Sequence, residues 1–276
     1  MQLESVKFHN GGYCWQLARL AGSKSWKPRR FFAVFLSFVH PKYGLCVIDT
    51  GYGPRVRAAQ RTFNGRLLNF LLPIPRNQPF EQANYLASGH GISTHHVNLV
   101  FVSHFHADHI GGLDLFPHST FVYRHETLEE LQAVSGYSQL RHGFLPMLIP
   151  SFFESQGCKV GEACFTQHAE RLPGLQVYDF FKDGSVLLLD LPGHALGHTG
   201  YFLRLQDKSL LYAVDAFWDL EAFQKSARLP APSRAATFNW PAYCRTQETL
   251  RNIQHTLKLN PLGCHCPHTQ AYVEQL

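Results

Sequence analysis

The sequence lacks a long hydrophobic run. Its longest apolar stretch, Phe31–Val39, is interrupted by Ser37 and is much shorter than a membrane-spanning helix requires. The first residues also lack the basic region and the following apolar segment that are typical of a secretory signal. We therefore expect a cytoplasmic protein that does not insert into a membrane.

Dense clusters of charge are also scarce. The formal net charge is +5, but only segment 24–30 carries basic residues close together. Proteins that bind backbone phosphates usually present larger basic patches. A solvated loop is therefore the favoured interpretation of this segment, and a nucleic-acid partner is not expected.

Cysteines in a regular, paired arrangement are missing as well. The seven cysteines are scattered and odd in number, which favours reduced thiols over a disulfide framework. What the chain does contain is enough apolar material for a sizeable core, because 45% of its 276 residues are hydrophobic. This length suffices for one large domain or two small ones.

The most informative stretch follows the apolar run Asn98–Val102, which predicts a buried strand. Four potential metal ligands, His104, His106, Asp108 and His109, lie within the next six residues. Imidazoles and carboxylates bind divalent metals such as zinc. A solvated, histidine-rich loop is the alternative, but so dense a cluster rarely serves that purpose alone.

This stretch resembles the HxHxDH signature of the metallo-β-lactamase superfamily. A second stretch, 192–198, reads Pro-Gly-His-Ala-Leu-Gly-His and resembles the superfamily's second histidine motif. The resemblance implies an α/β fold, a four-layer α/β/β/α sandwich, formed by a single domain over residues 1–276. The layout is similar to that of acyl-homoserine lactonases and of thioesterase-like members.

The resemblance also implies a set of metal ligands for two divalent cations, most simply Zn²⁺, with iron or manganese as alternatives. One cation would be held by His104, His106 and His194, and the other by Asp108, His109 and His265. Asp215 would bridge the two cations, and His268 is an alternative to His265. Asp49 and His198 would support the ligands from outside.

By the same resemblance, the protein is expected to be a metal-dependent hydrolase. A metal-activated water would cleave a lactone, ester or thioester of an apolar, small-molecule acyl substrate, with Asp108 also acting in catalysis. Quorum quenching is one role that this activity would allow. The resemblance is also compatible with a homodimer. Lactonases place a tyrosine at the substrate where this chain has Trp218. Tyr201 and Tyr212 are candidates to replace its hydroxyl, or else belong to the core.

Two other functions and one structural question stay open at this point. A phosphodiesterase or nuclease of the same superfamily would account for the basic composition, and a non-catalytic member would bind an effector instead. Segment 135–172 is apolar without a clear period. It predicts either a cap that shapes an apolar pocket over the active site or a loop and helix that cover the core.

Overall fold

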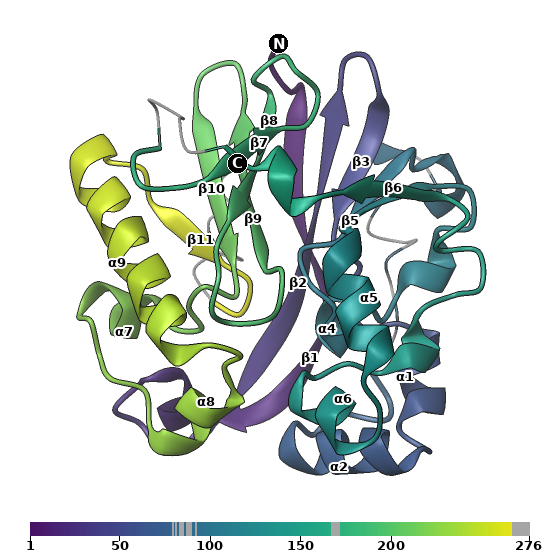
Figure 1. The fold of residues 1–276 in the computed structure, drawn as a ribbon, viewed down its shortest axis with the longest axis vertical. Helices are drawn as coiled ribbons and strands as arrows, with labels where there is room; N and C mark the ends of the chain where they lie inside the picture. The colour runs from purple at the N-terminus through teal and green to yellow at the C-terminus, as the bar shows by residue number, and fades with distance from the viewer. Residues whose placement is uncertain are drawn as a thin grey trace.

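The computed structural model describes residues 1–78, 80, 82, 86, 90–91, 93–166 and 172–266. Within them, the strands form two mixed sheets that pack face to face (Figure 1). The first sheet has the order β1-β2-β3-β4-β5-β6. Its strands are β1 (Ser5–Leu17), β2 (Pro28–His40), β3 (Gly44–Ile48), β4 (Leu99–Phe101), β5 (Thr120–Arg124) and β6 (Gly157–Val160).

The second sheet has the order β11-β10-β9-β8-β7, in which only the β10–β11 pair is parallel. Its strands are β7 (Val177–Asp179), β8 (Val186–Asp190), β9 (Thr199–Arg204), β10 (Ser209–Val214) and β11 (Pro261–Gly263). The long antiparallel ribbon of β1 and β2 opens the first sheet, and parallel pairing begins between β3 and β4.

Helices cover the outer face of each sheet (Figure 1). The described α-helices are α1 (Pro54–Ala59), α2 (Phe63–Leu71), α4 (Ala107–Ile110), α5 (His125–Ala133), α6 (Tyr137–Arg141), α7 (Leu220–Gln224), α8 (Ala231–Ala236) and α9 (Trp240–Leu257). Short 3₁₀ helices are η1 (Ala18–Ala21), η2 (Thr94–His96), η3 (Leu113–Leu115), η4 (Pro146–Leu148) and η5 (Glu162–Cys164). Among the described residues, no helix combines the length and apolar character that crossing a membrane requires.

Three apolar clusters hold these layers together. Along β2, Phe35 packs beneath the helices that cover the first sheet, whereas Leu36 and Phe38 point between the two sheets. This follows from the alternation of side chains along a strand. On the far side, Leu250 and Ile253 of α9 pack against the second sheet. The layers are therefore helix, sheet, sheet and helix, which confirms the predicted α/β/β/α sandwich.

Candidate metal centre

The predicted ligands all follow the carboxyl ends of strands. His104 lies just after β4, Asp215 directly follows β10, and His265 comes two residues after β11. His194 lies in the loop after β8. Because these strand ends meet at the same edge of the sandwich, side chains far apart in sequence come together there.

The turn after β4 separates the ligands of the HxHxDH motif. His106 has an extended backbone and caps α4, so the chain changes direction before Asp108 and His109. His104 and His106 precede this turn and lie beside His194. His109 follows the turn, and its ring lies 4.1 Å from that of His104 and faces that of His265 at a ring-centroid distance of 6.4 Å.

Three imidazoles and one carboxylate make up a first cluster. Nε2 of His194 lies 3.0 Å from Nδ1 of His106 and 3.2 Å from Nε2 of His104. It is also 3.2 Å from Oδ2 of Asp215. The donor atoms of all four residues lie within 4.8 Å of one another. The structure thus brings together the four residues that the sequence assigned to one cation and to the bridge.

A second cluster shares Asp215 with the first. It contains His109, Asp215, Cys264 and His265, again with donor atoms within 4.8 Å of one another. Oδ1 of Asp215 faces Nε2 of His265 at 3.3 Å, and Oδ2 lies 3.4 Å from Nε2 of His109. Asp108 adjoins this cluster, with its Oδ2 3.5 Å from Nε2 of His265 and 3.6 Å from Nε2 of His109.

Hydrogen bonds to the outer ring nitrogens fix how several histidines face the clusters. Nδ1 of His109 donates to Oδ2 of Asp49 at 2.7 Å, and Nδ1 of His265 donates to the carbonyl of Phe32 at 2.7 Å. Nδ1 of His104 lies 3.0 Å from the hydroxyl of Ser103, which itself donates to Asp49 at 2.7 Å. Each of these rings therefore directs its Nε2 toward the clusters, which is how metal-binding histidines are commonly oriented.

Several buried polar atoms of the clusters have no hydrogen-bond partner among the described residues. They include Nε2 of His109, Nδ1 of His194 and Oδ1 of Asp215. An unpaired buried polar group is costly, so such groups usually indicate a missing partner. The imidazole and carboxylate donors suit divalent cations such as zinc. The residues present therefore fit a pair of cations.

A model of the Metallo-beta-lactamase superfamily matches residues 32–237. The chain belongs to the metallo-beta-lactamase superfamily. Among curated relatives, the N-acyl homoserine lactonase AttM of Rhizobium johnstonii is 27% identical over 241 residues, which cover 84% of this chain and 81% of that protein. AttM of Agrobacterium fabrum is 28% identical over 203 residues, covering 70% of this chain and 68% of that protein.

A solved structure of an N-acyl homoserine lactone hydrolase, with the product N-hexanoyl-L-homoserine at its catalytic metal centre, has the same fold. Its TM-score is 0.73 at 18% sequence identity, and the match covers 99% of this chain and 97% of that one. In the present chain, both histidine motifs lie at one edge of the two packed sheets.

Charge within the centre is distributed unevenly. Burial by itself would raise the pKa of Asp215, but His265, His109 and His194 hold it well below the ordinary value. Burial and neighbouring imidazoles lower the pKa of His106 to about 3 and that of His104 well below its ordinary value. His104 and His106 are therefore neutral imidazoles beside one carboxylate, which is the protonation state that metal binding requires.

The second cluster attracts positive charge more strongly. Burial alone would lower the pKa of His109, but Asp108, Asp49 and Asp215 raise it well above the ordinary value. Asp49 also accepts a hydrogen bond from the backbone N–H of Ser103 at 2.8 Å and is fully buried. Three carboxylates thus converge around one imidazole, and a divalent cation there would offset their charge.

His198, the other predicted supporting residue, orients the shared carboxylate. Its Nδ1 donates to the carbonyl of Leu191 at 2.9 Å, and its Nε2 accepts from the backbone N–H of Asp215 at 3.2 Å. The preceding residue, Val214, has a φ of 51°, which is strained for a β-branched side chain. The backbone is therefore held in an unusual conformation where it presents Asp215 to both clusters.

The aromatic residues considered at the substrate position are placed differently. The Trp218 ring lies edge-on to the His194 ring at 5.5 Å, beside the first cluster. Tyr201 and Tyr212 are fully buried in the core between the sheets, and the Tyr212 hydroxyl donates to the carbonyl of Val34. Both tyrosines thus belong to the core. His268 lies outside the described residues.

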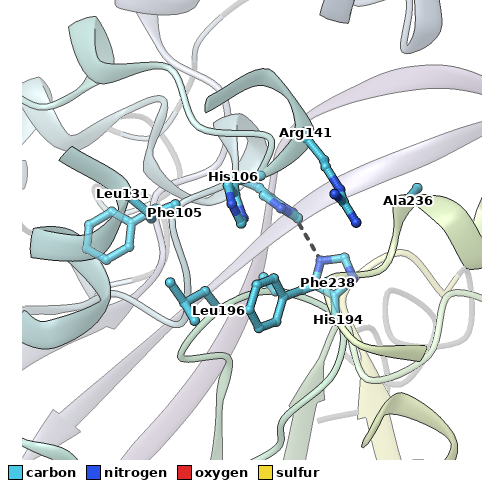
Figure 2. A pocket seen from close by; sticks show the side chains of 10 residues that line it. Phe105, His106, Leu131, Arg141, His194, Leu196, Ala236 and Phe238 are labelled. Carbon is cyan, nitrogen blue, oxygen red and sulfur yellow. Dashed lines mark hydrogen bonds between the residues drawn. The ribbon is translucent and has the colours of Figure 1, made fainter. Parts of the chain in front are cut away.

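A pocket adjoins the first cluster (Figure 2). His106 and His194 line it, and Arg141 extends from α6 into the space between α6 and α8. The remaining lining residues are mostly apolar: Phe105, Leu131, His142, Ala195, Leu196, Ala236 and Phe238. Sequence reasoning did not identify Arg141 or Phe238, because they lie far from the motifs and only the fold brings them to the site.

The described part of segment 135–172 contributes both to the buried core and to the lining of the pocket. Phe144, Leu148 and Phe153 are buried in the outer core beneath the first sheet's helices, whereas Arg141 and His142 line the pocket. Gly143 lies between these groups, and a side chain there would meet Cδ2 of His106 at 2.6 Å. The described part of this segment thus approaches the centre closely.

Proposed function

We propose that this protein is a dinuclear metal-dependent hydrolase that opens lactones, or cleaves esters or thioesters, of apolar acyl compounds. The observation that carries the proposal is the pair of adjoining clusters that share Asp215. We assign His104, His106 and His194 to one cation and Asp108, His109 and His265 to the other. Zn²⁺ is the proposed metal.

Each part of the site has a definite task in this proposal. Two bound divalent cations would supply Lewis acidity, lowering the pKa of a water molecule from near 16 toward about 7 and polarising a carbonyl. Asp108 is only half-buried and lies 3.5 Å from His265, so its carboxylate can hold a proton and pass it to the leaving oxygen or sulfur. Trp218 contacts the substrate through its ring or its indole N–H.

The apolar lining of the pocket, rather than its enclosed volume of only about 10 Å³, supports an apolar acyl group as the substrate portion that would lie beside the first cluster. Phe105, Leu196 and Phe238 supply apolar surface, while the guanidinium of Arg141 can donate hydrogen bonds to an acyl or amide oxygen. The relatives named N-acyl homoserine lactonases add weight to a lactone as the scissile group. We therefore place N-acyl lactones first among the substrate classes.

The test combines metal analysis with a substrate panel. The purified protein should contain about two divalent ions per chain, and it should open N-acyl homoserine lactones in preference to acyl thioesters, aryl esters and bis-aryl phosphodiesters. Chelation should abolish turnover and added Zn²⁺ should restore it. A preference for the phosphodiester would replace the proposal with a phosphodiesterase, and metal binding without any turnover would favour an effector-binding role.

A further inference from the structure

Basic residues are concentrated in the first part of the chain. Twelve of the 25 lysines and arginines lie within residues 1–80, where Glu4 and Asp49 are the only acids. Asp49 is fully buried beneath the metal centre and cannot neutralise the surface. The surface formed by this part of the chain is therefore strongly cationic, although the whole chain carries a net charge of only +5.

Helix α2, within this basic region, presents large apolar side chains to solvent. Phe63 is 80% exposed and Phe70 is 78% exposed, while Leu71 is 54% exposed. A separation of seven residues places the two phenyl rings on one face of the helix, with the exposed Arg66 between them. The opposite side buries Gly65. The helix is thus amphipathic, but its most apolar face points outward.

This face continues onto neighbouring elements. The side-chain amide of Gln16 donates to the carbonyl of Leu71 at 2.8 Å, and the backbone N–H of Trp15 donates to the carbonyl of Pro73 at 2.9 Å. Trp15 is itself 41% exposed. Exposed aromatic rings of α2 and β1 therefore lie on adjoining elements rather than on separate parts of the molecule.

The same end of the molecule carries the pocket. The side chain of Asn64 in α2 donates to the carbonyl of Gly136 at 3.0 Å, immediately before α6. The hydroxyl of Ser233 in α8 donates to the carbonyl of Leu20 in η1 at 2.7 Å. Figure 1 shows α2, α6 and α8 at the lower end of the view. Since α6 and α8 supply Arg141 and Ala236 to the pocket, the α2 face lies at the end of the molecule that contains the pocket.

We propose that the α2 face, formed by Trp15, Phe63, Arg66, Phe70 and Leu71, docks on the surface of a bilayer that contains anionic phospholipids. The phenyl rings would enter the boundary between headgroups and acyl chains, and the surrounding arginines would attract the anionic headgroups. Docking would bring the pocket near the phase in which apolar acyl compounds concentrate. The binding itself does not depend on the proposed hydrolase activity.

Charge and apolar contacts together favour a bilayer over a second copy of the chain and over a nucleic acid. A two-fold contact between copies would place Arg66 of one copy close to the same residue of the other, which is unfavourable without intervening anions. A nucleic acid would satisfy Arg66 and stack unpaired bases on the phenyl rings, but it would leave the exposed aliphatic side chain of Leu71 without apolar contacts. An anionic bilayer satisfies both features at once.

The test measures co-sedimentation of the full-length protein with vesicles. The protein should bind vesicles of phosphatidylcholine mixed with phosphatidylglycerol, bind weakly to phosphatidylcholine alone, and be released by added salt. The double variant Phe63→Ser/Phe70→Ser should lower the partition coefficient about tenfold or more, since each ring loses its burial in the interface. Arg66→Glu should lower it about tenfold through charge reversal.

Leu257→Ser provides the matched control, because Leu257 is 44% exposed at the end of α9, outside the α2 face. It should bind vesicles like the unaltered protein, and all variants should keep the same circular dichroism spectrum. Vesicle binding that the α2 variants leave unchanged would overturn the proposal. The absence of vesicle binding would also overturn it. In that case, a dimer in light scattering that Phe63→Ser/Phe70→Ser dissociates would identify a second copy as the occupant, and loss of RNA oligonucleotide binding in Arg66→Glu would identify a nucleic acid.

Discussion

The two clusters of the metal centre share a carboxylate but are supported differently. In the second cluster, His109 is backed by the buried carboxylate of Asp49 and His265 by a backbone carbonyl. In the first cluster, His104 is held by the Ser103 hydroxyl, but Nδ1 of His194 has no hydrogen-bond partner among the described residues, and His106 packs closely against Gly143. The difference indicates that hydrogen bonds orient the second cluster, whereas close packing contributes more to the orientation of the first.

The largest expected effect comes from removing the charge that both clusters share. Asp215→Asn should eliminate binding of both cations and reduce hydrolysis to background, because the negative charge between three imidazoles is lost. Metal content per chain and turnover check this outcome. Asp207→Asn, in the exposed turn before the same strand, is the control and should retain both. Retention of two ions by Asp215→Asn would rule out a bridging role.

Asp49→Asn should weaken the second cluster more than the first, because Asp49 bonds directly to His109 but reaches His104 only through the Ser103 hydroxyl. The amide cannot act as a charged acceptor for His109 Nδ1, and loss of such an outer partner typically costs about 10- to 100-fold in metal affinity. Competition with a chelator should therefore remove one ion much more readily than the other.

The control for this variant is Asp183→Asn, because Asp183 also faces an imidazole, that of His40, at 3.1 Å but away from the centre. It should leave the affinity for both ions unchanged. Equal weakening of both ions by Asp49→Asn would contradict the distinction between the clusters.

A smaller effect is expected where packing orients the first cluster. In Gly143→Ala, the added methyl group would meet the His106 ring, and residue 143 has a positive φ of 63°. Displacement of His106 should lower kcat about tenfold while the second cluster retains its ion, since small misplacements at a site are costly. The measurement is kcat together with the metal content.

Gly136→Ala separates the contact from the backbone strain. Gly136 has a similar positive φ of 58°, but a side chain there would meet no atom within 4 Å. Both substitutions therefore place a side chain on a residue with positive φ, and only Gly143→Ala should affect turnover. If the two variants lose the same activity, the close approach to His106 has no functional role.

The sequence predicted one part of this centre far better than the rest. His104, His106, Asp108 and His109 lie within six residues, so short-range pattern was enough to bring them to notice. The family resemblance supplied the sandwich and the more distant ligands. By contrast, Arg141 enters the pocket only through the packing of α6, and no local pattern marks it. Likewise, no local pattern marks which face of α2 remains exposed to solvent.

Cys264 shows the same limit within the centre, because its nearness to His109 and Asp215 depends on how β11 pairs with β10. Burial raises the pKa of its thiol well above the ordinary value, and its Sγ lies 3.5 Å from the carbonyl of Val34. Because the Cys264 thiol is directed to this carbonyl, and His109, His265 and Asp215 already supply donor atoms, we expect Cys264 to pack beside the second cluster without ligating it.

Cys264→Ser should therefore have the smallest effect on the centre, changing metal content and kcat less than about twofold, because a hydroxyl can make the same contact with Val34. Cys46→Ser is the control for stability, since Cys46 is also fully buried with its Sγ 3.5 Å from a backbone carbonyl. Both variants should lower the melting temperature to a similar extent. Selective loss of the second cluster's ion in Cys264→Ser would instead make the thiolate a ligand, and the second cluster would then rely on sulfur as well as on carboxylates.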